Sequence, residues 1–267
     1  MQNHYSAKDH TFVLCAYGES PYLEDCVLSL LAQSLKTNII ISTSTPNDHI
    51  RRVASRFDIP LFINDGPSGI SHDWNCAVWH CSTPLVTIAH QDDIYLPGFA
   101  ARVIEAFCQS ERPLISFTDY GELRDGTTVD NSRILGVKRI LLGPLKLRCL
   151  RHLRFVRRRI LAFGSSICCP SVTFCMDHLP TPLFLDDMRC DLDWEAWERF
   201  SKLDGDFLYI PHILMRHRIH EGSETTALIE DDTRSREDLE MLQKFWPDSI
   251  AKLVNHFYSS SQISNNL

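Results

Sequence analysis

Two adjacent carboxylates, Asp92 and Asp93, are separated by two residues from an apolar run, Pro84 to Ala89, that is typical of a buried strand. Carboxylate oxygens on a short loop are ligands that Mg²⁺ or Mn²⁺ prefers when the ion also binds phosphate oxygens. The same pair precedes Pro97, where a helix is expected, so either carboxylate could instead cap that helix. The pattern therefore supports two interpretations, a metal site at Asp92 and Asp93 or a helix cap.

A second acidic group opens a helix-like segment that runs from Asp191 to Phe200. Asp193, near the start of this segment, has the chemistry of a general base that removes a proton from an attacking hydroxyl. Trp194 and Trp197 beside it would offer an apolar wall or a stacking face to a bound ring. The alternative is that Asp193 only caps the helix and that both tryptophans belong to the core.

Basic, imidazole and hydroxyl side chains lie close together in the segment from His217 to Thr225. Arg218 suits a diphosphate, because a guanidinium can form two parallel hydrogen bonds to phosphate oxygens. The imidazole of His220 can complete the ligand shell of a metal ion. A single histidine is usually structural, but this grouping keeps a binding site and a structural role equally open.

Composition and charge exclude several classes of protein. Hydrophobic residues make up 44% and charged residues 23% of the 267 residues, as in ordinary globular proteins. The chain has no apolar run of about 18 residues and begins with a polar segment, so we expect a cytoplasmic protein. The net charge of −7 argues against binding to nucleic acid. Ten cysteines without paired C-x-x-C spacing suggest reduced thiols.

One basic stretch departs from this acidic background. Residues 138–159 carry nine lysine and arginine residues and no acid, interleaved with apolar residues. Such a segment could touch anionic lipid, which would make the protein peripheral on the inner membrane face, or a phosphate-bearing acceptor. The alternative is a solvated face whose charges pair with acids elsewhere.

Short apolar runs alternate with helix-period segments in the first hundred or so residues, which predicts βαβ units on a mostly parallel sheet. Ser20 and Pro21 should start the first helix, and Asn47 or Asp48 the second. Asp92 and Asp93 would then lie outside the carboxyl end of a strand, where such sheets bind ligands. The expected strands are Thr11 to Ala16, Asn38 to Ser42, Leu61 to Ile63, Pro84 to Ala89 and Leu114 to Thr118, with helices to about Ser34 and Phe57, near Ser71 to Cys81 and near Pro97 to Cys108.

The alternation becomes irregular after Thr118, which predicts a mixed α and β second half. We expect one domain over residues 1–267, with a ligand-binding half at 11–110, a second half at 111–226 and a C-terminal helix and tail at 227–267. The expected elements are helix over much of Val137 to Leu161 with a break at Gly143, a strand at Ser171 to Cys175, a helix at Asp193 to Leu203, strands near Phe207 to Ile210 and Leu214 to His217, and a final helix from Arg234 to Tyr258, kinked at Pro247.

Taken in order, these segments resemble the family 2 glycosyltransferases, from Phe12 to about Thr226. The opening Cys15-Ala16-Tyr17-Gly18-Glu19, the run Leu30-Leu31-Ala32-Gln33-Ser34, the segment Asp73-Trp74-Asn75 and the tetrapeptide His90-Gln91-Asp92-Asp93 are similar to motifs of that family. Asp193 falls where the family has its catalytic base, and Arg218, His220 and Ser223 resemble its closing Arg-x-His-x-x-Ser.

This resemblance implies an α/β GT-A fold, with a Rossmann-like, mostly parallel central sheet flanked by helices. It further implies an inverting, metal-assisted transfer from a nucleotide-diphosphate sugar to an acceptor hydroxyl, with Mn²⁺ or Mg²⁺ as cofactor. The implied metal ligands are Asp92, Asp93 and His220, the implied base is Asp193, and the implied acceptor contacts are Trp194 and Trp197. The implied nucleotide-sugar contacts are Ala16, Tyr17, Glu19, Thr43, Asn75, Gln91, Asp92 and Arg218.

The chain departs from the family pattern at the donor side. Ser42 and Thr43 stand where an Asp-Asp pair ordinarily holds the nucleobase, His90 replaces the first acid of Asp-x-Asp-Asp, and Trp74 replaces an arginine. We therefore expect the donor to carry another nucleotide, or its base to be held by Thr43 and Asn47.

The implied partners are the sugar donor and a saccharide or lipid-linked acceptor of surface polysaccharide or glycoconjugate synthesis, and a homodimer stays open. The rival functions are a non-catalytic nucleotide-sugar-binding scaffold and a nucleotidyltransferase. A nucleotidyltransferase is less favoured, because no G-x-x-x-x-G-K-[ST] loop follows the first strand.

Overall fold

The structure is a computed structural model that describes residues 4–220 and 233–263. In the described residues the strands are β1 (His10–Cys15), β2 (Asn38–Thr43), β3 (Leu61–Ile63), β4 (Leu85–His90), β5 (Ile94–Tyr95), β6 (Pro113–Arg124), β7 (Thr127–Val129), β8 (Val172–Cys175) and β9 (Asp206–Ile219). The α-helices are α1 (Leu23–Leu31), α2 (Asp48–Arg56), α3 (Ile70–Trp79), α4 (Phe99–Cys108), α5 (Arg133–Leu142), α6 (Arg154–Arg159), α7 (Leu192–Ser201), α9 (Thr233–Gln243) and α10 (Asp248–Ile263). Short 3₁₀ turns are η1 (Ala7–Asp9), η2 (Gly143–Lys146), η3 (Arg148–Leu150), η4 (Cys169–Ser171) and η5 (Met176–His178).

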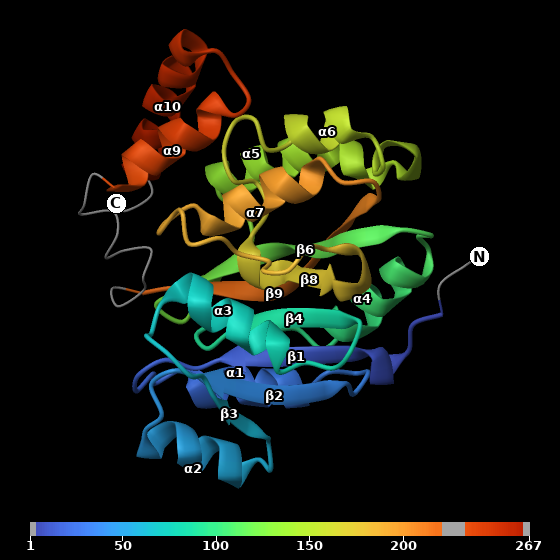
Figure 1. Cartoon of the computed structure of the whole chain (residues 1–267), viewed down its shortest axis with the longest axis vertical. Helices are drawn as coiled ribbons and strands as arrows, with labels where there is room; N and C mark the ends of the chain where they lie inside the picture. The colour runs from blue at the N-terminus through green and yellow to red at the C-terminus, as the bar shows by residue number, and fades with distance from the viewer. Residues whose placement is uncertain (1–3, 221–232, 264–267) are drawn as a thin grey trace.

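All of these strands belong to one sheet, in the order β3-β2-β1-β4-β8-β6-β9-β5, with β7 paired to β6 (Figure 1). The first four strands in this order are parallel, with β1 between β2 and β4. Strand β8 is inserted antiparallel between β4 and β6, whereas β6 and β9 run parallel to each other. The sheet confirms the predicted α/β class with a parallel first half and a mixed second half.

Alternating side chains on the parallel strands supply a separate core on each face of the sheet. Phe12 and Leu14 of β1 belong to the core formed with α1, α2 and α4. Val13, between them, belongs to the core formed with α3, α7 and α9. This alternation follows from the two-residue period of a strand, in which successive side chains point to opposite faces. Helices α5, α6 and α7 cover the second half of the sheet, with α9 and α10 beyond them (Figure 1).

Helix starts agree with the sequence prediction at one site and differ at another. Asn47 caps α2 as predicted, because its side chain accepts a hydrogen bond from the Ile50 backbone N–H at 2.9 Å. The prediction that Ser20 caps a helix starting at Pro21 is wrong. Helix α1 begins at Leu23, and the Ser20 hydroxyl instead accepts from the Tyr22 backbone N–H at 3.3 Å within a turn.

The second half differs most from the prediction in the length of its elements. Strands β6 and β9 continue past polar residues and pair along eleven positions, with register irregularities around Asp119. The two strands expected near 207–210 and 214–217 are therefore one strand, β9. The expected helix over 137–161 is divided into α5, η2, η3 and α6, and the expected C-terminal helix is two helices separated at residues 244–247, before and at Pro247.

Candidate functional site

The predicted metal pair lies in the turn between β4 and β5, at the carboxyl end of β4. The Asp92 carboxylate is 3.1 Å from the His220 Nε2 atom, and both side chains are about one-fifth exposed, at 23% and 21%. Arg218 also contacts this turn, because its Nε donates to the Asp92 carbonyl at 2.8 Å. The end of β9 therefore brings the three residues together that the sequence predicted for metal and diphosphate. Ser223, the fourth, lies outside the described residues.

Asp93 points the other way and is completely buried. One of its carboxylate oxygens accepts from the Arg218 backbone N–H at 2.9 Å and from His217 Nδ1 at 3.1 Å. Burial alone would lower the pKa of His217, but the Asp93 carboxylate raises it above its ordinary value. We therefore assign Asp93 to fixing β9 against the turn and no longer to the metal shell, because its side chain does not reach the surface.

Tyr22 completes this cluster from the loop before α1. The Arg218 guanidinium lies 4.3 Å from the centre of the Tyr22 ring, and the His220 ring lies 4.9 Å from it. Asp25 lies 3.6 Å from the other end of the guanidinium. These contacts hold a cation beside Asp92, as a site for a diphosphate requires.

The loop after β1 is fixed to the same turn by Gln91. Its side-chain oxygen accepts from the Tyr17 backbone N–H at 2.9 Å, and its side-chain nitrogen donates to the Tyr17 carbonyl at 3.0 Å. Ala16 is buried, whereas the side chains of Tyr17 and Glu19 are exposed. Of the residues predicted to contact the donor, Gln91 uses its side-chain amide to hold the loop after β1. Tyr17 and Glu19 are exposed to solvent.

Two of the departures from the family pattern contact each other. The Trp74 ring stacks on the His90 ring, with 4.9 Å between centroids and 29° between planes, and meets Phe184 edge to face. An aromatic pair thus occupies the place where the resemblance implies an arginine and an acid. Neighbouring Asn75 is buried and fully engaged, since its side chain hydrogen bonds with the backbone of Leu183 and Phe184. Asn75 therefore holds the segment around residue 184 against α3.

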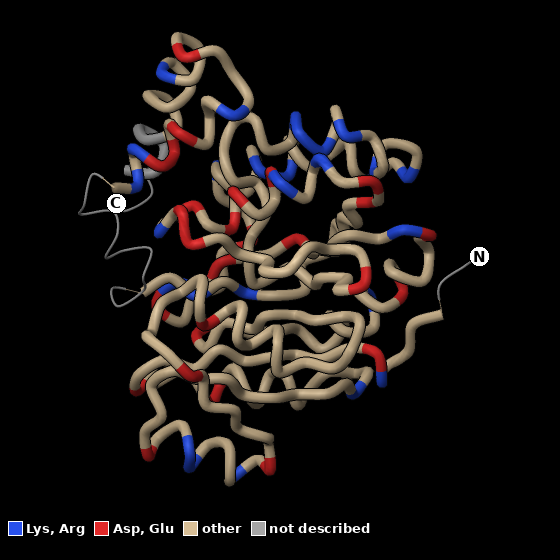
Figure 2. Tube along the Cα trace, in the orientation of Figure 1, with Lys and Arg blue, Asp and Glu red and all other residues tan. Residues whose placement is uncertain are grey.

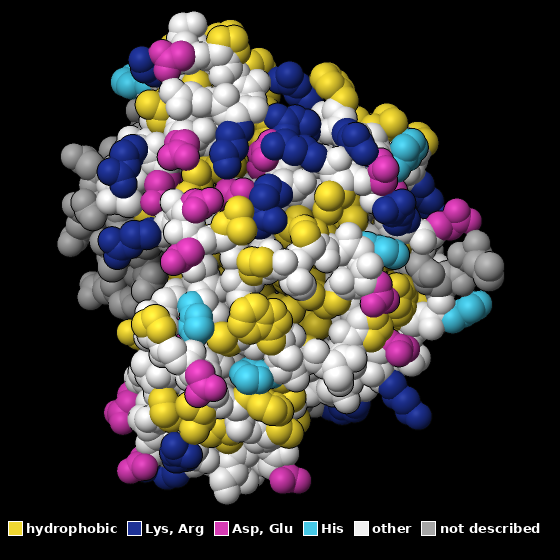
Figure 3. All heavy atoms as spheres, viewed as in Figure 1, with side chains coloured by type: hydrophobic (Ala, Val, Ile, Leu, Met, Phe, Trp, Pro, Cys, Tyr) yellow, Lys and Arg dark blue, Asp and Glu magenta, His cyan; other side chains and the backbone are white. Residues whose placement is uncertain are grey.

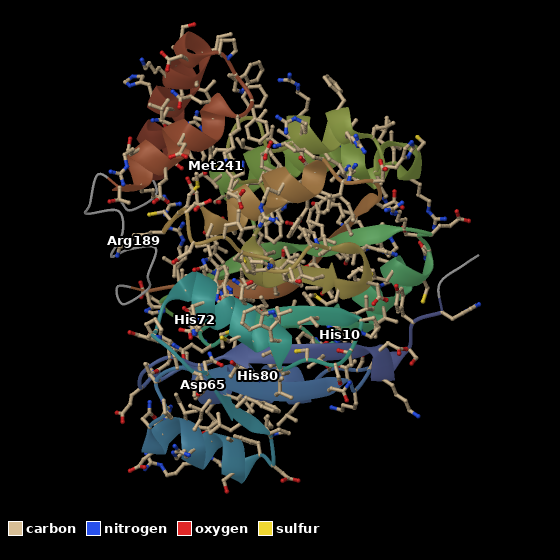
Figure 4. The ribbon with its side chains drawn as sticks, in the orientation of Figure 1. His10, Asp65, His72, His80, Arg189 and Met241 are labelled. Atoms are coloured by element: carbon tan, nitrogen blue, oxygen red, sulfur yellow. The ribbon has the colours of Figure 1, made fainter. Side chains whose placement is uncertain are left out.

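A carboxylate from α3 lies where strands β1 and β2 end. Asp73 accepts from the Ser44 hydroxyl at 2.8 Å and from the Asn64 side-chain amide at 3.1 Å. Burial raises the pKa of the Cys15 thiol, and the Asp73 carboxylate adds to the shift, which places Asp73 near the end of β1. Thr43 is buried, and its hydroxyl accepts from the Thr45 backbone N–H at 3.1 Å. Figure 4 labels His72 of α3, His80 just after this helix and Asp65 before it.

Asp193 lies in the first turn of α7, half-buried. Burial raises the pKa of Asp193 to about 6, against the hydrogen bond from the Trp194 backbone N–H and the nearby cations Lys138 and Arg234. A carboxyl group with this pKa is ionised at neutral pH and is a stronger base than an exposed aspartate. It has the proton affinity that a general base needs.

The two halves of the candidate site meet at the Cys168–Cys169 segment. Burial raises the pKa of the Cys169 thiol, and the carboxylates of Asp193 and Asp93 both add to the shift. The turn between β4 and β5 that carries Asp92 and Asp93, the predicted metal turn, leads to Tyr95. The Tyr95 hydroxyl donates to the Pro170 carbonyl at 2.9 Å. The base and the metal turn therefore approach one short segment from opposite halves of the chain.

Trp194 and Trp197 are both completely buried. The Trp194 indole donates to the Leu161 carbonyl at 3.1 Å, and Trp197 stacks on Phe174. Neither ring presents a face to an acceptor, so the alternative interpretation of the sequence, in which both belong to the core, replaces the acceptor assignment.

The residues present fit a divalent cation that takes most of its ligands from the substrate. Among the described residues there is no group of three or more His, Cys, Asp or Glu side chains that could hold a metal alone. Mg²⁺ and Mn²⁺ are commonly held by one or two protein ligands together with phosphate oxygens and water. Asp92 and His220, accessible and in contact, have the composition of such a partial shell.

Solved structures of glycosyltransferases share this fold. The structure resembles the mannosyltransferase PcManGT of Pyrobaculum calidifontis, solved with GDP-Man and Mn²⁺, with a TM-score of 0.62, 13% identity and coverage of 96% of this chain and 70% of that one. It also resembles S. aureus TarS 1–349 in complex with UDP-GlcNAc, with a TM-score of 0.60, 12% identity and coverage of 92% and 70%. These likenesses show a glycosyltransferase GT-A fold.

The family follows from the sequence itself. The model of glycosyl transferase family 2 matches residues 11–170, more than half of the chain. The chain belongs to this family and is a glycosyltransferase. No curated protein sequence matches it.

Sequence reasoning missed three residues of the site. Tyr22 belongs to none of the sequence motifs, and only its position between the first strand and the first helix could have suggested a role for it. Lys138 was grouped with the basic stretch, yet its ammonium donates to the Tyr120 hydroxyl at 3.0 Å and acts on Asp193. Glu237 of α9 accepts hydrogen bonds from the backbone of residues 189–191, just before α7, and this pairing could not be known from the sequence.

Proposed function

We propose that this chain transfers a sugar, with inversion, from a nucleoside diphosphate to an acceptor hydroxyl, and that Asp193 is the base that takes the hydroxyl proton. The observation that carries the proposal is the position of Asp193: a partly exposed carboxylate in the first turn of α7, near the Cys168–Cys169 segment. Tyr95, just after the Asp92–Asp93 turn, also contacts this segment through the Pro170 carbonyl. We further propose that residues 1–267 work as one domain, with a donor half at 11–110 and an acceptor half at 111–226.

Asp92 and His220 are the metal ligands in this proposal, and Arg218 binds the diphosphate. The bound ion would supply positive charge that stabilises the departing nucleoside diphosphate. Arg218 is oriented for its role by the Tyr22 ring and by the Asp92 carbonyl. PcManGT, of the same fold, is recorded with Mn²⁺, which supports a divalent ion without deciding between Mn²⁺ and Mg²⁺.

Asp193→Asn tests the base. The variant keeps the size of the side chain and removes its proton affinity, so we expect the transfer rate to fall about 100-fold or more while donor binding stays unchanged. Asp187→Asn, an exposed aspartate in the preceding loop, is the matched control. A wild-type rate in Asp193→Asn would remove the base assignment. Wild-type protein that binds nucleotide sugars but transfers none would favour the scaffold function instead.

Asp73 is our candidate for recognition of the nucleoside. It supplies a carboxylate at the ends of β1 and β2, where the resemblance implies acids from β2 that this chain lacks. The carboxyl ends of parallel strands are where sheets of this kind bind nucleotides. Its Ser44 and Asn64 contacts fix its orientation.

A thermal-shift screen identifies the donor. Ligands that bind only the folded protein raise its melting temperature, by an amount that grows with the logarithm of concentration over Kd. GDP sugars and UDP sugars, each with Mn²⁺, are the first ligands to screen, since the two similar structures hold GDP-Man and UDP-GlcNAc. Asp73→Asn should lose the shift for the nucleotide that wild type prefers and keep its own melting temperature. A full shift in Asp73→Asn would exclude this carboxylate from recognition.

We also propose that the surface over α5, η3 and α6 contacts anionic lipid. None of the helices in the described part of the chain is long and apolar enough to cross a membrane. The surface combines arginine and lysine with apolar side chains (Figures 2 and 3). Ile140 is 77% and Phe155 70% exposed, and Leu147 is also exposed.

Only part of the basic stretch is available to a lipid surface. Arg157 is buried, Arg139 pairs with Asp119 and Arg158 with Glu198, so these cations serve the interior. Sedimentation with phosphatidylglycerol vesicles, against neutral phosphatidylcholine vesicles, tests the rest. Ile140→Ser with Phe155→Ser should reduce the bound fraction about tenfold. Equal binding by wild type and this double variant would remove the proposal.

A further inference from the structure

A carboxylate from helix α9, near the C-terminus, binds the backbone just before α7, the helix that carries Asp193. Glu237 of α9 is buried and accepts from three consecutive backbone N–H groups. The distances are 3.0 and 3.1 Å from Arg189, 2.7 Å from Cys190 and 3.2 Å from Asp191. Asp191 directly precedes α7, and Asp193 lies two residues further on. Figure 4 labels Arg189 at one end of this contact and Met241 on the helix that supplies Glu237.

The rest of α9 holds this contact in place. Met241 and Leu242 of α9 are completely buried in the core that α7 shares, and Phe245, just after α9, stacks on Trp194 at 6.4 Å between centroids. Asp238 is also buried, beside the carboxyl group of Asp191. Burial raises the pKa of Asp191 well above its usual range, and the Asp238 carboxyl group adds to the shift.

Three N–H groups on one carboxylate form a fixed anion-binding turn. Such turns arise where successive backbone N–H groups point to the same side, and their hydrogen bonds to an ionised acceptor are strong. Asp191 gives α7 no side-chain cap bond, so the segment entering the helix depends on Glu237 for its orientation. The contact joins residues that lie 46 to 48 positions apart in the sequence.

We propose that Glu237 is a positioning residue for catalysis: by binding the backbone of residues 189–191, it fixes the direction and the burial of the Asp193 carboxylate. This inference rests on the proposed role of Asp193 as the base. It assigns the C-terminal helices a part in the reaction, although α9 and α10 lie outside the matched family segment at 11–170.

Amide hydrogen exchange tests the contact without any assay of transfer. In the wild-type protein the amides of residues 189–191 should be protected, and Glu237→Gln should weaken that protection, because the acceptor loses its negative charge and one of its two acceptor atoms. Glu240→Gln, an exposed glutamate on the same helix, is the matched control and should exchange like wild type. Unchanged protection of 189–191 in Glu237→Gln would overturn the proposal.

Kinetics then test the consequence for the base. We expect Glu237→Gln to lower kcat by about tenfold or more with an unchanged KM for the donor, since a small displacement of a catalytic group is costly. The acid limb of its pH profile should also move to lower pH, because a released loop admits water to Asp193. The groups that face Asp193 from packed elements and its own segment, Lys138, Arg234, Cys168, Cys169 and Asp191, are unchanged in this variant.

A general loss of stability would lower the amount of active enzyme but would leave the pH limb in place. If Glu237→Gln does not fold, Glu237→Asp keeps the charge and shortens the reach, and the same two measurements apply. Asp193→Asn is run in parallel. A wild-type kcat and pH limb in the Glu237 variants, with an inactive Asp193→Asn, would refute the positioning role alone, whereas an active Asp193→Asn would refute the base itself.

Discussion

Replacing Asp93 by alanine removes the contact that joins the metal turn to the end of β9. The carboxylate is completely buried and accepts from the Arg218 backbone N–H and from His217 Nδ1. Truncation leaves both donors without their acceptor, and loss of one partner of a buried charged pair costs about 3–5 kcal/mol. In a domain of this size, 1 kcal/mol corresponds to roughly 2–4 °C, so the melting temperature should fall by about 10 °C.

The informative comparison is with Asp92, the adjacent residue. Asp92 is partly exposed, and its carboxylate contacts His220 rather than the core. We expect Asp92→Ala to keep its melting temperature within about 2 °C of wild type, as surface substitutions usually do, and to lose the Mn²⁺-dependent part of nucleotide binding.

Circular dichroism melts and calorimetric titration of nucleotide, with Mn²⁺ and with chelator, measure both effects on the same samples. Asp93→Asn, which keeps one acceptor oxygen, should lower the free energy of unfolding by an intermediate amount, about 1.5–3 kcal/mol. The reasoning is refuted if Asp93→Ala melts with wild type, or if Asp92→Ala destabilises the fold as much as Asp93→Ala does.

Three further predictions follow from the described contacts. Because Asp193 acts as a base only when ionised and its pKa is about 6, the transfer rate should be level above that pH and fall about tenfold per unit below it; a rate profile that stays level to pH 4.5 would contradict this. Trp74→Arg and His90→Asp should each destabilise the protein in urea, and the double variant should recover about 1–3 kcal/mol through a new ion pair; strict additivity would show that the two rings are not coupled. Asn47→Ala should cost about 1 kcal/mol, because the Ile50 backbone N–H loses its cap, and an unchanged urea midpoint would exclude that cap as a stabilising bond.

The parallel half of the fold was predictable because its signals are local. Apolar runs such as Pro84 to Ala89 end at polar residues, and the carboxyl end of β4 does deliver Asp92 to the surface beside Arg218 and His220. Asp92 is far from Arg218 and His220 in the sequence, but their proximity could still be predicted, because parallel strands bring their carboxyl ends to one edge of the sheet. Family membership, carried by ordered motifs, was recognisable for the same reason.

Side-chain direction was not predictable from the same residues. Asp92 and Asp93 are chemically identical, and only the pairing of β9 against the turn decides that one faces outward and the other inward. Likewise Trp194 and Trp197 sit where an acceptor face was expected, but the packing of Phe174 and Phe245 makes them core. Contacts of this kind join segments far apart in sequence and leave no periodic signal.

The predicted length of strand β6 was wrong for a related reason. Polar residues after Thr118 ended the predicted strand, yet β6 continues to Arg124 because β9 pairs with it along its whole length. Tertiary pairing overrides local propensity in strands more than in helices.

The adjacent thiols at Cys168 and Cys169 have a chemical consequence for an enzyme that handles activated sugars. Burial, with two carboxylates nearby, raises the pKa of both thiols, so neither forms the thiolate that would be nucleophilic at neutral pH. Sulfur held this way does not compete with an acceptor oxygen for an electrophilic carbon. The protein can therefore place polarisable, space-filling atoms near the Asp193 and Asp93 carboxylates without forming a thioglycoside on itself.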